Sequence, residues 1–315
     1  MQTYNRDWKT YNQRLVDRGR VITILIEPQL LESETLQKMN KNKPGRRFKF
    51  CSGLISAAFA VKCVFRLPYR QLEGFMRDVS DKLHKSIPNF RTIWWRIDRM
   101  KSEGVKFGIH KGKNMVIAID STGLRPVNDG EYRSMKYDVR KEWIKLHAIV
   151  DVKTKEILNV TVTKGNVGDN TQFKQVVGPL LPNISAIFAD KAYDAAKTFD
   201  FCEENGIFAG IPVKVNATNS VAKSRMRRRM IEEQLGWSCR RGSTRLNRFL
   251  TEAKRRENQE CWKEKVGYGR RSQIESSFSR YKRLLGENVF SRKKRNIEKE
   301  IVAKINVLNR FAVMN

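Results

Sequence analysis

The chain has 315 residues, 40% of them hydrophobic, which is enough for a sizeable core and about two domains. This composition excludes a disordered protein. Lysine and arginine number 63 against 33 aspartate and glutamate residues, so the formal net charge is +30. Such an excess of positive charge predicts a polyanionic partner, above all a nucleic acid.

The cysteines and the apolar stretches restrict where the protein acts. Five cysteines are scattered without a Cys-x-x-Cys pair, so we expect neither a disulfide framework nor a zinc knuckle, and a reducing cell interior. The polar N-terminus predicts no secretion signal. The longest apolar stretch, residues 50–65, contains Lys62 and is too short to span a bilayer, so we expect a buried helix and no membrane partner.

Residues 1–110 are expected to form a helical N-terminal domain, because apolar residues recur at helical spacing between Pro and Gly turns. Two short periodic segments on either side of Pro88 predict a helix-turn-helix that binds DNA. Its second helix would carry a basic and aromatic face that meets a DNA groove: Arg91, Trp95, Arg96 and Arg99. A plain helical hairpin with a solvated basic face is an equal alternative.

From residue 111 onward the pattern changes to short apolar runs. MVIAID, WIKLHAIVD and EILNVTVT predict three adjacent antiparallel strands. A helix, a fourth strand ending at Asp190, a second helix and a further strand follow. Dense charge over residues 214–264 predicts a basic helical insertion. A closing helix and a C-terminal amphipathic helix complete an expected second domain, residues 111–315.

The closing helix has the most informative spacing. Four residues follow an i, i+3, i+7, i+14 pattern: Tyr268, Arg271, Glu275 and Lys282. On one α-helix they would share an arc of about 60°. Upstream, Asp120 in VIAIDSTG and Asp190 in IFADKAYD each end an apolar run, as strands that deliver acids to a sheet edge would. Two such acids and a helical glutamate can hold a metal pair, which predicts an enzyme that cuts and joins DNA.

The order of the elements is that of the ribonuclease-H-like fold. Residues 115–290 resemble the DDE transposases of bacterial and archaeal insertion sequences, most closely the IS-five group. The matching pieces are IAIDSTGL, KLHAIVDVKTKEI leading to GNVGDN, ADKAYD, and the Y-R-E-K signature from Tyr268 to Lys282. The resemblance implies an α/β fold with a ribonuclease-H-like (integrase/transposase) catalytic core, an N-terminal helical domain and a helical insertion before the last catalytic helix.

Three clustered acids require cations, because two carboxylates at 4 Å repel by about 4 kcal/mol at an effective dielectric near 20. Asp120, Asp190 and Glu275 are therefore expected to bind two Mg²⁺ ions, with Mn²⁺ as a substitute, since oxygen ligands without a His or Cys cluster disfavour zinc. The resemblance implies that water frees a 3′-hydroxyl at the ends of the transposable element. This hydroxyl then attacks target DNA by transesterification, without a covalent protein–DNA intermediate.

Several basic residues are predicted to contact DNA. Family roles assign Tyr268, Arg271 and Lys282 to the backbone around the scissile bond, and the basic runs add four arginines: Arg91, Arg96, Arg227 and Arg228. The expected partner is double-stranded DNA, both the terminal inverted repeats of the element and the target. Joining two ends implies a homodimer or larger assembly, and the resemblance implies a cytoplasmic, nucleoid-associated protein of a prokaryote.

Simpler interpretations exist for some of these residues. Arg271 and Glu275 could form a surface ion pair, although Arg before Glu at i, i+4 is the less favourable orientation. Three other aspartates are rivals for the acid roles, but each has a structural explanation: Asp151 in a hairpin turn, Asp169 as a helix N-cap and Asp194 before the next helix. His147 is expected to be an interior, hydrogen-bonded residue, with His84 and His110 at the surface.

Two other functions fit the pattern less well. One is an inactive, domesticated DNA-binding protein derived from such an element, for which intact catalytic residues are a poor fit. The other is a ribonuclease-H-like nuclease without strand transfer. A tyrosine recombinase is disfavoured because no histidine is followed by arginine three residues later, and a rolling-circle enzyme because no His-x-His box occurs.

Overall fold

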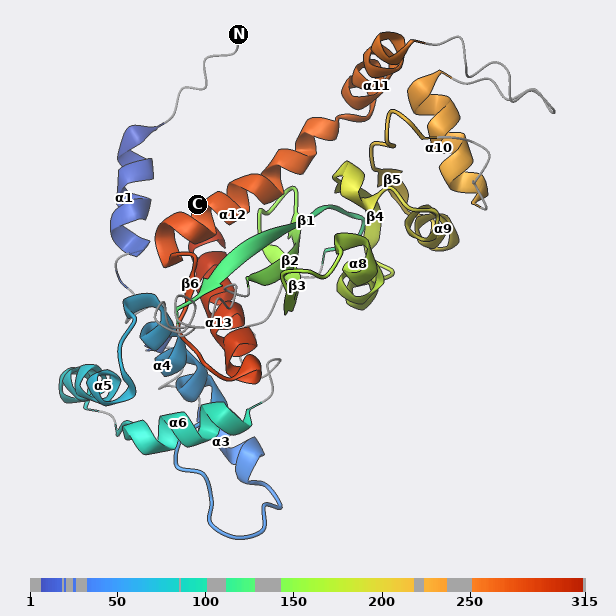
Figure 1. Ribbon diagram of the computed structural model, residues 1–315. Coiled ribbons are helices and arrows are strands. Elements are labelled where there is room, and N and C mark those ends of the chain that lie inside the picture. The colour runs from blue at the N-terminus through green and yellow to red at the C-terminus, as the bar shows by residue number, and fades with distance from the viewer. Residues whose placement is uncertain are drawn as a thin grey trace, which may run out of the picture. The chain divides into compact units, whose positions relative to one another are not determined.

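The computed structural model describes residues 7–18, 20, 25–26, 33–84, 86–100, 112–127, 143–217, 224–236 and 251–313. His110 lies outside these residues. The chain divides into two compact units (Figure 1). The first contains residues 1–108, 126–139 and 281–315, and the second contains residues 109–125 and 140–280.

The described residues of the first unit are mainly helical, as predicted for the N-terminal region. Its helices are α1 (Trp8–Arg18), α3 (Ser33–Asn40), α4 (Ser52–Phe65), α5 (Tyr69–Leu83), α6 (Phe90–Arg99) and α13 (Lys294–Val313). Most side chains of α4 are buried, which confirms that the apolar stretch is a core helix. None of the described helices is long and apolar enough to cross a bilayer.

The C-terminal helix α13 belongs to the first unit, whereas the sequence analysis expected residues 111–315 to form one domain. The reason is the apolar face of α13, where Ile301, Ile305 and Leu308 are buried. This helix packs against α4. A short strand in the same unit, β6 (Asn288–Val289), precedes α13, and the Val127 amide donates to the Val289 carbonyl oxygen at 2.9 Å.

The second unit is built on a mixed sheet. Its strands are β1 (Met115–Pro126), β2 (Ile144–Asp151), β3 (Ile157–Lys164), β4 (Ile184–Ala189) and β5 (Phe208–Gly210). They lie in the order β3-β2-β1-β4-β5. The pairs β1–β2 and β2–β3 are antiparallel, and the pairs β1–β4 and β4–β5 are parallel. Three adjacent antiparallel strands followed by parallel ones confirm the predicted ribonuclease-H-like α/β fold.

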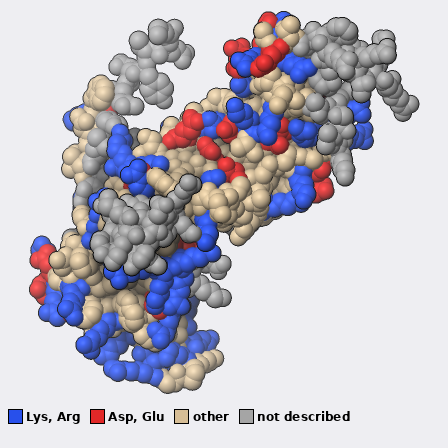
Figure 2. Space-filling view, viewed as in Figure 1, with Lys and Arg blue, Asp and Glu red and all other residues tan. Residues whose placement is uncertain are grey.

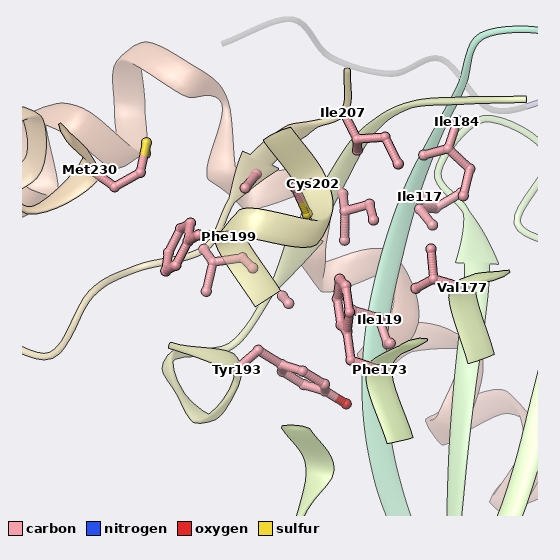
Figure 3. Close-up of a cluster of buried hydrophobic side chains, with 14 of the residues drawn as sticks. Ile117, Ile119, Phe173, Val177, Ile184, Tyr193, Phe199, Cys202, Ile207 and Met230 are labelled. Atoms are coloured by element: carbon pink, nitrogen blue, oxygen red, sulfur yellow. The ribbon is translucent and has the colours of Figure 1, made fainter. Parts of the chain in front are cut away.

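In the described part of the second unit, five α-helices accompany this sheet. They are α8 (Asp169–Val177), α9 (Ala196–Glu204), α10 (Arg225–Leu235), α11 (Glu252–Val266) and α12 (Ser272–Leu285). Helix α8 contacts β2 and β3, α9 contacts β5, and α12 continues past residue 280 into the first unit. Side chains of β1, β4, α8 and α9 form one apolar cluster, which includes Ile117, Ile119, Phe173 and Phe199 (Figure 3). Helix α10 lies within the predicted insertion, residues 214–264, whereas α11 begins there and ends two residues beyond it, at Val266.

The closing helix begins later than predicted. Gly267 ends α11 in the left-handed conformation, with φ of 66°, and Tyr268–Arg271 form a 3₁₀ turn before α12 starts at Ser272. The prediction that all four signature residues share one α-helical face is therefore wrong. Only Glu275 and Lys282 lie on α12, and the geometry of the other two is set by the turn.

Candidate active site

Strand pairing brings the two aspartates together. Ile119 of β1 pairs with Ala189 of β4 in a parallel register, so the next residues, Asp120 and Asp190, lie side by side at the same edge. Each carboxylate accepts a hydrogen bond from the following amide: Asp120 from Ser121 at 2.8 Å and Asp190 from Lys191 at 2.7 Å. Asp190 directly follows its strand, as predicted. Asp120 lies within β1, which continues to Pro126.

Arg271 connects the third acid to this edge. Its guanidinium donates to Asp120 Oδ2 at 3.1 Å through one terminal nitrogen and to Glu275 through the other. The Glu275 side chain is 53% exposed and that of Asp120 is 24% exposed. The ion pair between Arg271 and Glu275 therefore exists, but it is shared with an acid 151 residues away in the sequence.

Asp190 influences the pKa values of both Asp120 and Arg271. Burial raises the pKa of Asp120, and Asp190 and Asp169 raise it further, against the lowering effects of the Ser121 amide and Arg271. Burial also lowers the pKa of Arg271, but four anionic or polar neighbours reverse this and raise it: Tyr268, Glu275, Asp120 and Asp190. Arg271 is thus bound by two of the predicted acids, Asp120 and Glu275, and the third, Asp190, contributes to its raised pKa.

The acids have the chemistry of a magnesium or manganese site, since all their donors are carboxylate oxygens. Among the described residues, however, no three His, Cys, Asp or Glu side chains are close enough to hold one metal ion. The Arg271 guanidinium bridges Asp120 and Glu275, so it takes the position of a cation between them. By the chemistry of their donor atoms, these carboxylates fit a divalent ion.

Tyr268 has a different environment from the one predicted. Its hydroxyl donates to the Ala189 carbonyl oxygen at 3.0 Å, and its ring lies against Phe188 and Trp262. The hydroxyl proton is therefore used to hold the end of β4, directly before Asp190, rather than being free for a DNA backbone. Lys282 is half-buried in the last turn of α12, and its predicted phosphate contact stays a prediction.

Tyr193 was missed by the sequence analysis. It lies in the 3₁₀ turn Lys191–Tyr193 and is only 1% exposed, yet its hydroxyl has no hydrogen-bond partner among the described residues. Burial raises its pKa, and the nearby carboxylates of Asp169, Asp120 and Asp190 raise it further. Figure 3 shows its oxygen at the margin of the apolar cluster. The ADKAYD motif, with tyrosine three residues after the acid, was the available signal.

Asp169 is close to the site but does not cap its helix, so that prediction is wrong. The N-cap of α8 is Gly168, and Asp169 instead lies 3.0 Å from Lys145 Nζ and 3.4 Å from His147 Nδ1. His147 Nε2 contacts the Thr163 hydroxyl at 2.9 Å, which confirms an interior, hydrogen-bonded histidine. Burial is the main cause that lowers the pKa of His147, so the ring is neutral at pH 7.

The other two rival aspartates have structural roles. Asp151 accepts from the Lys153 amide at 2.9 Å and from the Thr154 hydroxyl at 3.2 Å, which confirms the predicted turn. Asp194 is buried and binds Arg227 through two hydrogen bonds of 2.6 and 3.1 Å. Arg227 was predicted to contact DNA, but in the structure its guanidinium is bound to the buried Asp194 and so has a structural role. The neighbouring Arg228 is exposed and pairs with Glu232 at 3.2 Å.

A basic cleft of ≈ 1240 Å³ opens beside Asp190 in the second unit. Six of its lining residues are cationic: Lys191, Lys214, Arg255, Arg256, Lys263 and Arg271. Only Asp190 and Glu252 are acidic among the described residues that line it. The cleft therefore offers a positively charged approach to the acids, which suits a phosphate backbone.

In the first unit, the structure corrects the prediction for Arg96. This residue is buried: its guanidinium donates to the Phe50 carbonyl oxygen and, at 2.9 Å, to the Ser52 hydroxyl. It therefore connects α6 to the start of α4 and is not free on an outer face. Arg91 is exposed, and its predicted DNA contact stays a prediction. His84 is at the surface, as expected.

A ribonuclease-H-like sheet with two aspartates at one edge and a helical glutamate beside them defines the class of DDE enzymes. Two family models, both described as a transposase DDE domain, match the chain, over residues 111–310 and 16–129. The first covers more than half of the chain, and the protein belongs to this family of DNA-cleaving transposases.

Two solved structures are similar over most of the chain. One is piggyBac transposase in a synaptic complex with hairpin DNA, at 9% identity and a TM-score of 0.41, covering 94% of this chain and 74% of that one. The other is the Drosophila P element transposase in a strand transfer complex, at 13% identity and a TM-score of 0.30, covering 94% and 71%. At these TM-scores the similarities carry no argument, and the fold assignment depends on the strand order.

Proposed function

We propose that the protein is the transposase of an insertion sequence of the IS-five group, and that it uses divalent metal ions to cleave element ends and join them to target DNA. The observation that carries this proposal is the Arg271 guanidinium shared by Asp120 and Glu275, beside Asp190, which follows the strand residue paired with Ile119. The family membership supports transposition as the reaction in which these acids act.

Asp120, Asp190 and Glu275 would hold two Mg²⁺ or Mn²⁺ ions, which when bound activate the attacking oxygen and stabilise the leaving one. Arg271 neutralises the carboxylates before that, because their mutual repulsion is unfavourable without a cation. When the carboxylates are engaged elsewhere, its guanidinium is available to a phosphate, which it can bind through two parallel hydrogen bonds. Arg271 also lines the basic cleft, where that phosphate would lie.

Other residues position the acids. Tyr268 fixes the carbonyl of Ala189 and so the direction in which the chain leaves β4 into Asp190. The Tyr193 hydroxyl has no hydrogen-bond partner among the described residues, and three carboxylates are near enough to raise its pKa; we assign to it a hydrogen bond to one of them or to a water molecule between them. The DNA substrate would be double-stranded terminal repeats and target, bound by an assembly of two or more copies in the nucleoid.

The test is Asp190→Asn in the full chain, with duplex DNA that carries the terminal repeats flanking the gene. Loss of a metal-binding carboxylate should remove about 4 kcal/mol of transition-state stabilisation, a roughly 1000-fold drop in end cleavage with Mg²⁺ or Mn²⁺. Binding of the same duplex in EDTA should persist. Asp200→Asn, on α9 of the same unit, is the matched control and should cleave normally. Unchanged cleavage by Asp190→Asn would contradict the proposal, and cleavage without joined products would identify a nuclease.

A further inference from the structure

A second basic site lies in the first unit, in a groove of ≈ 950 Å³ between residues 46–50 and the first turns of α6. Its cationic lining residues are Arg46, Arg47, Lys49, Arg91 and Arg96, and its aromatic ones are Phe48, Phe50, Trp94 and Trp95. No acidic side chain is among the described residues that line it. Figure 2 shows lysine and arginine side chains gathered over α3 and α6 of this unit.

The floor of the groove is held by specific contacts. The buried Arg96 guanidinium lies 4.8 Å from the centre of the Phe48 ring, in addition to its hydrogen bonds to Phe50 and Ser52. The start of α6 is also fixed, because Asn89 caps it by accepting from the Thr92 amide at 2.8 Å. The groove is therefore a preformed feature with an aromatic floor.

Two tryptophans stand at the edge of this floor. Trp94 and Trp95 are 47% and 46% exposed, which is unfavourable for large apolar rings unless a ligand covers them. Arg99 lies over the Trp95 ring at 4.2 Å. The ring of Trp94 has no aromatic or cationic partner among the described residues, so it is available for stacking.

The exposed face of α6 favours stacking over the reading of base edges. Its exposed positions are Arg91, Trp94, Trp95 and Arg99. None of them is Asn, Gln, Ser or Thr, so apart from the single indole N–H of each tryptophan only the arginines could donate hydrogen bonds to base edges in a duplex. Inside a duplex the faces of the bases are covered by their neighbours, so away from the duplex ends an indole ring can stack only where bases are unpaired.

We propose that this groove binds DNA with unpaired bases: Trp94 stacks on a base, and the cations at the rim, Arg46, Arg47, Lys49 and Arg91, contact the backbone phosphates. Stacking of a base on an aromatic side chain contributes about 1–3 kcal/mol and is tolerant of sequence. The proposal revises the expected helix-turn-helix, in which α6 would enter the major groove of intact duplex. It depends on the proposed function only in that the protein acts on DNA.

The experiment compares Trp94→Ala with the unchanged full chain by fluorescence anisotropy, at one fixed salt concentration and in EDTA. The probes are a labelled oligothymidylate of about 15 nucleotides, within the range that single-strand binding sites span, and a duplex of equal length. Trp94→Ala should weaken single-strand binding by about 5- to 150-fold and leave duplex binding within about twofold. Trp94→Phe keeps a smaller stacking ring, so its affinity for the single strand should lie between those of the unchanged chain and Trp94→Ala.

Trp8→Ala is the matched control, because Trp8 is an exposed tryptophan on α1 outside the groove and its loss should leave binding unchanged. Thermal unfolding of each variant verifies the fold. An equal loss on both probes, no loss on either, or an equal loss in Trp8→Ala would overturn the proposal. Because EDTA removes the metal, these results are independent of whether Asp190→Asn abolishes cleavage, so the two proposals can fail separately.

Discussion

Two clusters of ionised side chains, one in each unit, differ in how completely their charges are paired. In the first unit, Glu300 and Lys304 are buried and pair at 3.0 Å. Lys304 also donates to the Asn288 carbonyl oxygen at 2.7 Å, and Glu300 accepts from the Phe290 and Ser291 amides. In the second unit, the carboxylates of Asp120 and Glu275 share Arg271, Asp190 lies beside Asp120, and the buried Tyr193 hydroxyl has no partner among the described residues. Completely paired charges stabilise a fold, whereas acids in excess over their cations are suited to binding metal ions.

Exchanging a carboxylate for its amide in each region should separate the two roles. Asp120→Asn should reduce end cleavage by roughly 1000-fold, because a metal-binding oxygen is lost. It should not lower the free energy of unfolding at neutral pH, because burial and neighbouring acids already raise the pKa of Asp120 and make its charged form unfavourable. Cleavage assays and urea unfolding test the two statements.

Unlike Asp120→Asn, Glu300→Gln should lower the free energy of unfolding. It leaves the buried Lys304 ammonium without its partner charge, which typically costs about 3 to 5 kcal/mol of unfolding free energy. The control is Glu257→Gln, which removes an exposed pair with Lys254 and should cost less than about 1 kcal/mol. A Glu300→Gln protein as stable as the original would show that complete pairing does not distinguish the first unit.

The sequence predicted the strands and the acids because both depend on local patterns. Short apolar runs identify β1 to β4, and Asp190 was correctly placed at the end of its run. The spacing of the signature residues could not reveal the 3₁₀ turn, since i, i+3 and i+7 positions fit a continuous helix equally well. Only the turn explains why Tyr268 reaches Ala189 and Arg271 reaches Asp120.

The partners of the arginines were beyond sequence analysis for a related reason. Arg96 and Arg227 lie in strongly basic segments and look solvated, yet each is held by residues distant in the chain: Phe50 and Ser52 for one, Asp194 for the other. The allocation of α13 to the first unit has the same cause. Its amphipathic pattern predicts a buried face but does not say which helix covers it.

Two buried tyrosines allow a second comparison, between a hydroxyl near the site carboxylates and one away from them. Tyr193 and Tyr281 are both fully buried, and neither hydroxyl has a partner among the described residues, but only the pKa of Tyr193 is raised by the site carboxylates Asp169, Asp120 and Asp190. Tyr193→Phe should lower the cleavage rate about tenfold, the worth of one hydrogen bond, and should raise the Mn²⁺ concentration needed for half-maximal activity. Tyr281→Phe should change neither.

Phenylalanine preserves the packing of both rings, so both variants should unfold at the same urea concentration as the original protein. Equal rates and equal metal dependence for the two variants would contradict a positioning role for Tyr193. A loss of stability confined to Tyr193→Phe would instead assign its hydroxyl to the fold.

The smallest expected effect is on the stability of the fold at acid pH. As the pH falls, protonation of Asp98 should lower the free energy of unfolding, and protonation of Asp120 should raise it. Asp98 accepts hydrogen bonds from Arg295 at 2.5 Å and from Asn296 at 3.2 Å, and these contacts, Arg295 above all, lower its pKa from 3.8 to about 2. Its contribution to stability is therefore complete above pH 3.8 and is lost as the pH falls through about 2.

Asp120 should behave in the opposite way, because its raised pKa means that the folded chain binds the proton more tightly than the unfolded chain. Stability then increases as the pH falls through the pKa of this carboxyl group. Urea midpoints should be measured from neutral pH to the acid range. Relative to the original protein, the midpoint should fall less steeply with decreasing pH in Asp98→Asn and more steeply in Asp120→Asn. The same slope in both variants would mean that the two carboxylates do not differ as their surroundings require: the pKa of Asp98 is lowered mainly by Arg295, and that of Asp120 is raised mainly by burial.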